Sequence, residues 1–140
     1  MDCTVKWTGG TGMSFIAETG SGHILAMDGA PDGGGNNLAP RPMETVLAGT
    51  GGCTAYDVVL ILRKSNQKVK GCEVRLHAER AETDPKVFTK IHMHFIVRGE
   101  ELKPSLVESA IKLSHNKYCS ASIMLGKTAQ ITHDYEIVED

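Results

Sequence analysis

The longest segment with helical character is METVLAGTGGCTAYDVVLILRKSNQ, residues 43–67. Its apolar residues lie on nearly every side of a helical wheel, which is typical of a helix at the centre of a fold. Pro42 suits the first turn of this helix, where its missing N–H has no cost. Three of the four residues 49–52 are glycines, each costing about 1 kcal/mol relative to alanine in a helix. They indicate either close packing of another element or open access to Cys53, which follows them.

Strand-like segments flank this helix. Residues 3–28 alternate between apolar and polar side chains and are broken by glycines, which predicts a three-stranded antiparallel meander. Residues 71–80 and 87–98 alternate in the same way and predict a hairpin with one exposed face. The remaining elements are predicted as an amphipathic helix over 102–117, a short helix over 119–126 and a last strand over 128–138. Because strands and helices are segregated along the chain, the predicted fold class is α+β.

The composition excludes several classes of protein. The chain has 140 residues, a formal net charge of −2 and 5% aromatic residues, so neither a nucleic acid partner nor an anionic membrane surface is expected. No apolar run is expected to reach the roughly 20 residues of a membrane span. Residues 1–7 lack the basic start and apolar core of a signal peptide. We expect one domain, residues 1–140, in the cytoplasm.

One long loop is predicted over residues 29–42, with DGGGNN at positions 32–37. Glycine and asparagine in this density avoid regular structure. A phosphate-binding loop would need a following Gly-Lys-Ser/Thr, which is absent. We therefore expect a flexible cover over a site.

The four cysteines lie far apart in the sequence, which argues against a zinc knuckle or a disulfide scaffold. Cys3 and Cys72 lie on the apolar faces of predicted strands, and we expect both to be buried. Cys119 comes near a predicted helix N-terminus and follows two basic residues, which favours a thiolate. If folding brings Cys119 within disulfide reach of Cys53, with Cα atoms about 4.4 to 6.8 Å apart, the two can act as attacking and resolving thiols.

Three histidines face the same way on the predicted hairpin: His77, His92 and His94. A surface metal site is geometrically possible there, but a solvated sheet face is far commoner. We therefore expect no metal and no cofactor.

Two cysteine motifs resemble those of the OsmC/Ohr family, specifically its YhfA-like branch. They are GGCTAYDVV, residues 51–59, after PRPME at 40–44, and HNKYCS, residues 115–120. The likeness covers essentially the whole chain in the same element order. It implies an intertwined homodimer with the long helices at its centre, the sheets around them and two active sites at the subunit interface. It also implies thiol-dependent reduction of hydroperoxides, with Cys53 as the peroxidatic cysteine and Cys119 as the resolving one.

The resemblance further implies a role in oxidative or osmotic stress defence. The substrate would be a hydroperoxide, organic in the Ohr branch, and the partner a dithiol reductant of the lipoyl type. The alternative is a member of the family that does not turn over, acting as a redox sensor or as a binder of a small apolar molecule.

The chain departs from the family pattern near Pro42. In the peroxidases a glutamate follows the matching proline and holds an arginine from the early strands against the reactive thiolate. Here Met43 occupies that position, Glu44 comes about 100° further round the helix, and Arg41 is the first arginine in the chain. Arg41 and Glu44 either replace the thiolate-supporting pair from different positions, or Glu44 is only a first-turn carboxylate favoured by the helix dipole.

Tyr56 and Asp57 are candidate pocket residues beside Cys53. Tyr56 either lines the pocket or packs against other side chains. Asp57 follows Cys53 by one helical turn, so a nearby carboxylate would raise the pKa of the thiol. Alternatively, Asp57 anchors a partner group in the core of the dimer.

Overall fold

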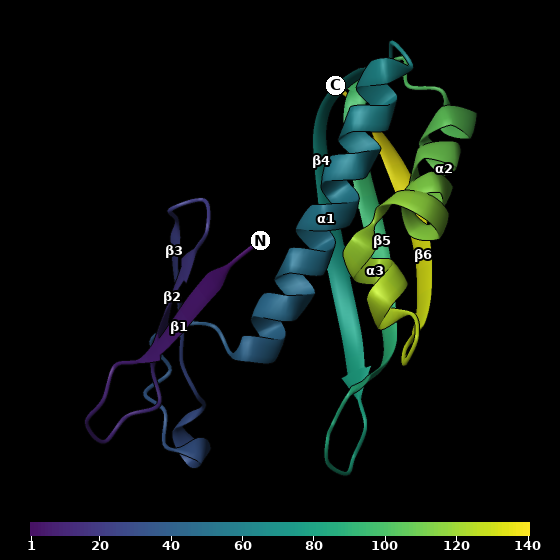
Figure 1. Cartoon of the computed structure of the whole chain (residues 1–140). Helices are drawn as coiled ribbons and strands as arrows, with labels where there is room; N and C mark the ends of the chain where they lie inside the picture. Colours follow the sequence, from purple (N-terminus) through teal and green to yellow (C-terminus); the bar gives the residue numbers. More distant parts are fainter. The chain divides into compact units, whose positions relative to one another are not determined.

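The computed structural model describes residues 1–140, which divide into two compact units, Met1–Ala48 and Gly49–Asp140. Figure 1 shows the elements of both. The first unit holds β1 Cys3–Trp7, β2 Phe15–Thr19, β3 Ile24–Met27 and the 3₁₀ turn η1 Pro31–Gly33. Helix α1 Pro42–Lys64 begins in the first unit and ends in the second. The second unit continues with β4 Lys68–Arg80, β5 Phe88–Glu100, α2 Pro104–Leu113, the π-helical turn η2 Ser114–Tyr118, α3 Ser120–Leu125 and β6 Gln130–Glu139.

Strands β1, β2 and β3 form the antiparallel meander that the sequence predicts. Every residue of β1 is exposed, and the apolar side chains of Val5, Trp7 and Ile24 keep 54%, 52% and 71% of their surface. Cys3 is exposed, so the expectation that it is buried is wrong within the single chain. A sheet this small with exposed apolar side chains is marginal alone and offers an apolar surface for packing.

The loop after β3 is organised by the carboxylate of Asp28, which is 1% exposed. Asp28 accepts backbone N–H bonds from Gly29 at 2.7 Å, Asn36 at 3.2 Å and Leu38 at 3.1 Å. These bonds, led by the one from Leu38, hold the pKa of Asp28 below its usual value. Gly35 is required by close approach, because a Cβ there would lie 2.0 Å from the carbonyl oxygen of Gly29. The loop is therefore pinned to the end of β3 rather than free along its length.

Helix α1 buries one face within the chain. Its buried residues recur about every four positions and comprise Thr50, Gly51, Thr54, Val58 and Leu62. Gly51 packs so closely on β4 that a Cβ there would lie 2.7 Å from Leu76 Cδ1, whereas Gly49 and Gly52 face open space. The glycine run thus serves close packing at one of its three glycines. The opposite side of α1 keeps apolar side chains exposed, so the helix is not enclosed on all sides by its own chain.

The length and hydropathy of α1 also meet the criteria for a membrane span. Thr50, Thr54 and Asp57 interrupt this window, so it is not a continuous apolar run. The same criteria are met by core helices of soluble proteins, and 28% of the apolar window of α1 is buried within this chain.

The second sheet has the order β4-β5-β6. Strands β4 and β5 are antiparallel, as predicted, and β6 runs parallel to β5 after the crossover through α2, η2 and α3. Figure 1 shows these helices, with the second-unit part of α1, on one face of the sheet. The side chains on that face are the core: Ile91, Met93, Phe95 and Val97 are each at most 2% exposed. An α+β fold with two three-stranded sheets is therefore confirmed.

The predicted helix over 102–117 ends earlier than expected. Helix α2 stops at Leu113 and is followed by the π-helical turn η2. The buried stripe of α2 consists of Val107, Ala110 and Ile111, whereas its last residue, Leu113, is 38% exposed. Single π-turns of this kind are frequent at functional sites. Here η2 ends immediately before Cys119.

Candidate active site

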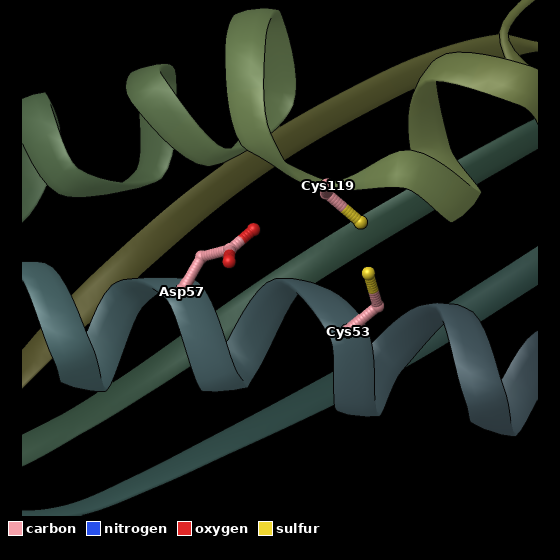
Figure 2. Close-up of side chains that lie close together, drawn as sticks. All are labelled: Cys53, Asp57 and Cys119. Atoms are coloured by element: carbon pink, nitrogen blue, oxygen red, sulfur yellow. The ribbon is translucent and has the colours of Figure 1, made fainter.

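The fold brings Cys53 and Cys119 together. Their Sγ atoms and a carboxylate oxygen of Asp57 all lie within 4.8 Å of one another. Figure 2 shows the two sulfurs directed toward each other from α1 and from the segment that leads into α3. Both thiols are free. The two residues are 66 positions apart (119 minus 53), so only folding can place them side by side.

Local structure determines the position of each of these side chains. Cys53 and Asp57 are separated by four residues on α1 and therefore share a helix face. Cys119 is the N-cap residue of α3, and its Sγ accepts a bond of 3.4 Å from the N–H of Ser122. The N–H of Cys119 donates to the carbonyl oxygen of Ser114 at 2.8 Å, which closes the π-helical turn. The predicted helix N-terminus at Cys119 is thus confirmed.

The two thiols differ in exposure. Cys119 is 0% exposed, whereas Cys53 is half-buried. Burial raises the pKa of Cys119, the bonds from Ser122 lower it by less, and the Cys53 thiol raises it further. Burial thus works against the thiolate that the sequence position of Cys119 favours, so that expectation is wrong. Cys53 is the sulfur that a molecule arriving from solvent meets first.

A buried hydroxyl chain holds the Asp57 carboxylate. Ser114 donates to Asp57 Oδ2 at 3.0 Å, so Thr54 Oγ1, 2.8 Å away, acts as the donor to Ser114 Oγ. Thr54 is 2% exposed and Ser114 0%. Sequence reasoning missed both hydroxyls. The sequence pattern that could have identified them is a polar residue at helical spacing from buried apolar residues: Thr54 lies four residues before Val58, and Ser114 four residues after Ala110.

Arg41 and Glu44 make different contacts from those of an ion pair. The Glu44 carboxylate accepts the backbone N–H of Arg41 at 2.9 Å, an arrangement that caps the first turn of α1. The Arg41 guanidinium donates to the carbonyl oxygen of Ala39 at 3.3 Å. The two side chains form no ion pair with each other. This geometry favours the reading of Glu44 as a first-turn carboxylate.

Tyr56 lies on the exposed side of α1, with 70% of its surface accessible. It lines a hollow of about 440 Å³ whose other walls include Ala55, Val59 and Leu60. Cys72 closes this hollow from β4. Burial raises the pKa of Cys72 to about 11, which agrees with an inert thiol, although the residue is half-buried rather than fully buried.

His92 and His94 form a hydrogen-bonded cluster with Asp134 on the exposed face of the sheet. Oδ1 of Asp134 lies 3.1 Å from His92 Nε2 and 2.7 Å from His94 Nδ1. Bonds from His94 and His92 hold the pKa of Asp134 below its usual value. His77 pairs with His92 across the strands but takes no part in these bonds. The cluster is solvated, since Asp134 is 60% exposed and His92 is 44% exposed.

The OsmC-like protein family profile matches residues 33–134. Protein YhfA of Escherichia coli K12 is 49% identical over 138 residues, which cover 99% of this chain and 98% of that protein. A structure solved by structural genomics is 47% identical over the whole of both chains, with a TM-score of 0.89. The organic hydroperoxide resistance protein OhrB of Bacillus subtilis is 16% identical over 97% of this chain and 98% of its own, with a TM-score of 0.62. On the family profile and the identity to YhfA, this chain belongs to the OsmC/Ohr family, in its YhfA-like branch.

Proposed function

We propose that the protein is a thiol-dependent reductase of organic hydroperoxides, with Cys53 as the attacking thiol and Cys119 as the resolving one. The observation that carries this proposal is the position of both sulfurs in one site, within 4.8 Å of each other. Family homologues point to peroxide-related and stress-related redox function, and the name of the Bacillus subtilis protein specifies organic hydroperoxide resistance. We therefore propose a role in oxidative or osmotic stress defence.

The chemistry has three steps. The Cys53 thiolate attacks an oxygen of the hydroperoxide, so the O–O bond breaks, Cys53 becomes a sulfenic acid and the alkoxide leaves as an alcohol after taking a proton. The Cys119 sulfur then attacks the Cys53 sulfur. An S–S bond forms, the S–O bond breaks, and the hydroxide leaves as water with the thiol proton. A dithiol of the lipoyl type restores both thiols by exchange and is itself oxidised to a disulfide.

Asp57 would assist the second step. Cys119 must lose its proton to attack, yet burial raises the pKa of this thiol. A carboxylate oxygen of Asp57 lies within 4.8 Å of the Cys119 sulfur, close enough to accept that proton through one water molecule. Ser114 and Thr54 would keep the carboxylate in place.

We also propose that the chain acts as one OsmC-like domain in a homodimer in the cytoplasm. Helix α1 keeps the apolar Leu60 and the ring of Tyr56 exposed at 38% and 70%. In the first unit, β1 and β3 also have exposed apolar side chains. A second copy of the chain would cover these residues. Light scattering on the purified protein checks the oligomeric state.

A specific feature favours a second candidate, a protein that senses oxidants or binds a small apolar molecule without turnover. Arg41 and Glu44 form no ion pair of the kind that supports the family's reactive thiolate. The hollow lined by Ala55, Tyr56 and Val59 is largely apolar and has room for a small ligand.

The deciding experiment is a thiol count and a peptide map of the fully reduced protein, before and after one equivalent of tert-butyl hydroperoxide, with hydrogen peroxide in parallel. We expect loss of two thiols per chain and a linkage between Cys53 and Cys119. Cys53→Ser should abolish the loss, and Cys72→Ser, outside the site, should leave it unchanged. Four surviving thiols in the wild type would contradict the reductase. A linkage that forms once but is not recycled by dihydrolipoamide would favour the second candidate.

A further inference from the structure

The same three side chains have the composition of a metal site. The sulfurs of Cys53 and Cys119 and a carboxylate oxygen of Asp57 all lie within 4.8 Å of one another. A tetrahedral Zn²⁺ ion, with Zn–S bonds of about 2.3 Å and Zn–O bonds of about 2.0 to 2.2 Å, holds its ligand atoms about 3.5 to 3.8 Å apart. The three donors therefore need to approach one another by little more than about 1 Å to hold such an ion.

The carboxylate is held by a hydrogen bond from a neighbouring hydroxyl. Asp57 Oδ2 accepts the hydroxyl of Ser114, whose own oxygen accepts the hydroxyl of Thr54. Asp57 Oδ1 accepts no side-chain or backbone hydrogen bond within the second unit, so it remains available to a cation. Metal-binding carboxylates are commonly fixed by such outer partners. Both hydroxyls are buried, which makes this support rigid.

The charge of the donor set also favours a divalent cation. Two thiolates and one carboxylate together carry three negative charges. Within the second unit, no lysine or arginine forms an ion pair with Asp57; the ion pairs of that unit lie on its exposed strands and on α2. Thiolate sulfur prefers ions of the zinc type over magnesium or calcium.

From these observations we propose that the reduced protein binds one Zn²⁺ per chain through the sulfurs of Cys53 and Cys119 and a carboxylate oxygen of Asp57. The fourth position would remain open on the side of the half-buried Cys53. Binding releases two thiol protons to solvent and transfers no electrons. Because metal and disulfide both require the same two sulfurs, the Zn²⁺ form would be protected from oxidants and the disulfide form would not bind metal. This proposal goes beyond the reductase activity and does not depend on it.

Nitrogen ligands are also present on the opposite, solvated face of the sheet. His92 and His94 share the carboxylate of Asp134 there, and exposed histidines also take up divalent metals. The experiment must therefore separate sulfur ligands from nitrogen ligands. Co²⁺ does so, because sulfur-to-cobalt charge transfer gives an absorption that imidazole and carboxylate ligands do not.

The test is a titration of the reduced, full-length protein with Co²⁺ under argon and without hydroperoxide, followed by displacement with Zn²⁺. We expect one Co²⁺ per chain with a thiolate charge-transfer band that Zn²⁺ removes. Cys53→Ser and Cys119→Ser should each abolish the band. Asp57→Asn should weaken metal binding by at least about 10-fold. Loss of a group that only supports a metal ligand already weakens binding by about 10-fold to 100-fold, and Asp57 would itself be a ligand. Cys72→Ser and the double variant His92→Asn/His94→Asn should bind as the wild type does.

Three results would overturn the proposal: no charge-transfer band in the wild type, a band that survives both cysteine substitutions, or unchanged affinity in Asp57→Asn. Circular dichroism and a melting curve for each variant show that it is folded. If Asp57→Asn does not fold, Ser114→Ala tests the same carboxylate through its support, with an expected loss of about 10-fold or more. Hydroperoxide consumption measured in the presence of a chelator tests the reductase separately, so failure of one proposal is distinguishable from failure of the other.

Discussion

Asp28, directly after β3, and Asp57, on helix α1, are two carboxylates whose surroundings differ in one decisive respect. The oxygens of Asp28 accept three backbone N–H groups from the loop that follows it. Asp57 accepts one hydroxyl, at Oδ2, and lies beside two thiols. A carboxylate whose acceptor capacity is used by the backbone stabilises structure, whereas one with an unused oxygen beside reactive sulfurs is available for chemistry. The difference is visible only when the partners of each oxygen are counted.

The largest effect is expected from Asp57→Asn on the rate of disulfide formation. The amide keeps an acceptor for Ser114 but cannot take the proton of the Cys119 thiol. We expect the single-turnover loss of two thiols after hydroperoxide to slow by about 100-fold, a typical contribution of a general base. Stopped-flow quenching followed by thiol counting measures this rate. An unchanged rate in a folded variant would show that Asp57 has no part in the proton transfer.

Ser114→Ala should have a large effect on stability. It leaves the buried hydroxyl of Thr54 and the Asp57 carboxylate without their shared partner. Leaving a buried polar group unsatisfied costs about 1 to 3 kcal/mol, so the free energy of unfolding should fall by that amount in a urea titration. Ser109→Ala on the preceding helix α2 is the matched control, because Ser109 is exposed. Equal losses in the two variants would contradict the importance of the hydroxyl chain.

Asp28→Asn should change the pH dependence of stability. The pKa of Asp28 is lowered in the folded protein, so its contribution to stability is fully present above the unfolded pKa of about 3.9 and is lost as pH falls through the lower folded pKa. The melting temperature of the wild type should therefore exceed that of the variant most at pH 6 to 7, and the two should converge toward pH 3. A difference that is constant with pH would mean that the ionised form of Asp28 is not what holds the loop.

Asp134→Asn should have the smallest effect. This carboxylate is 60% exposed and bonds only to two histidines on the solvated face. Solvent screens such contacts, so the melting temperature at pH 7 should shift less than it does for Asp28→Asn. Differential scanning calorimetry of the two variants side by side gives the comparison. A larger shift for Asp134→Asn would mean that exposure does not determine how much each carboxylate contributes to stability.

Much of the fold was predictable because it follows local patterns. Alternation predicted the strands, and helical spacing predicted α1 and α2. Burial was harder to predict, because it depends on packing partners that are distant in sequence. Cys3 has the alternation of a buried strand residue but is exposed in the single chain. The end of α2 at Leu113 was missed since a π-helical turn keeps the composition of the helix that it follows.

The candidate site was also predicted only in part from the sequence. Cys53 and Cys119 were identified as a candidate pair, and the motifs that resemble the OsmC/Ohr family supported that pairing. Thr54 and Ser114 were not identified, because a hydroxyl in a buried stripe has meaning only when its partner is known, and these partners are 60 residues apart. For Arg41 and Glu44 the sequence left two readings open, which the bonds of their side chains distinguish better than spacing can.

The number of residues in the π-helical turn Ser114–Tyr118 determines the geometry of this site. The carbonyl oxygen of Ser114 accepts the N–H of Cys119 five residues later, while the hydroxyl of Ser114 supports Asp57. One residue therefore sets the positions of the carboxylate and of the buried sulfur together. Removing a single residue between Ser114 and Cys119 would rotate the cysteine by about 100° around the helix axis and turn its sulfur away from Cys53. Substitutions at the exposed Asn116 and Lys117 would preserve that count and leave the direction of the Cys119 sulfur unchanged.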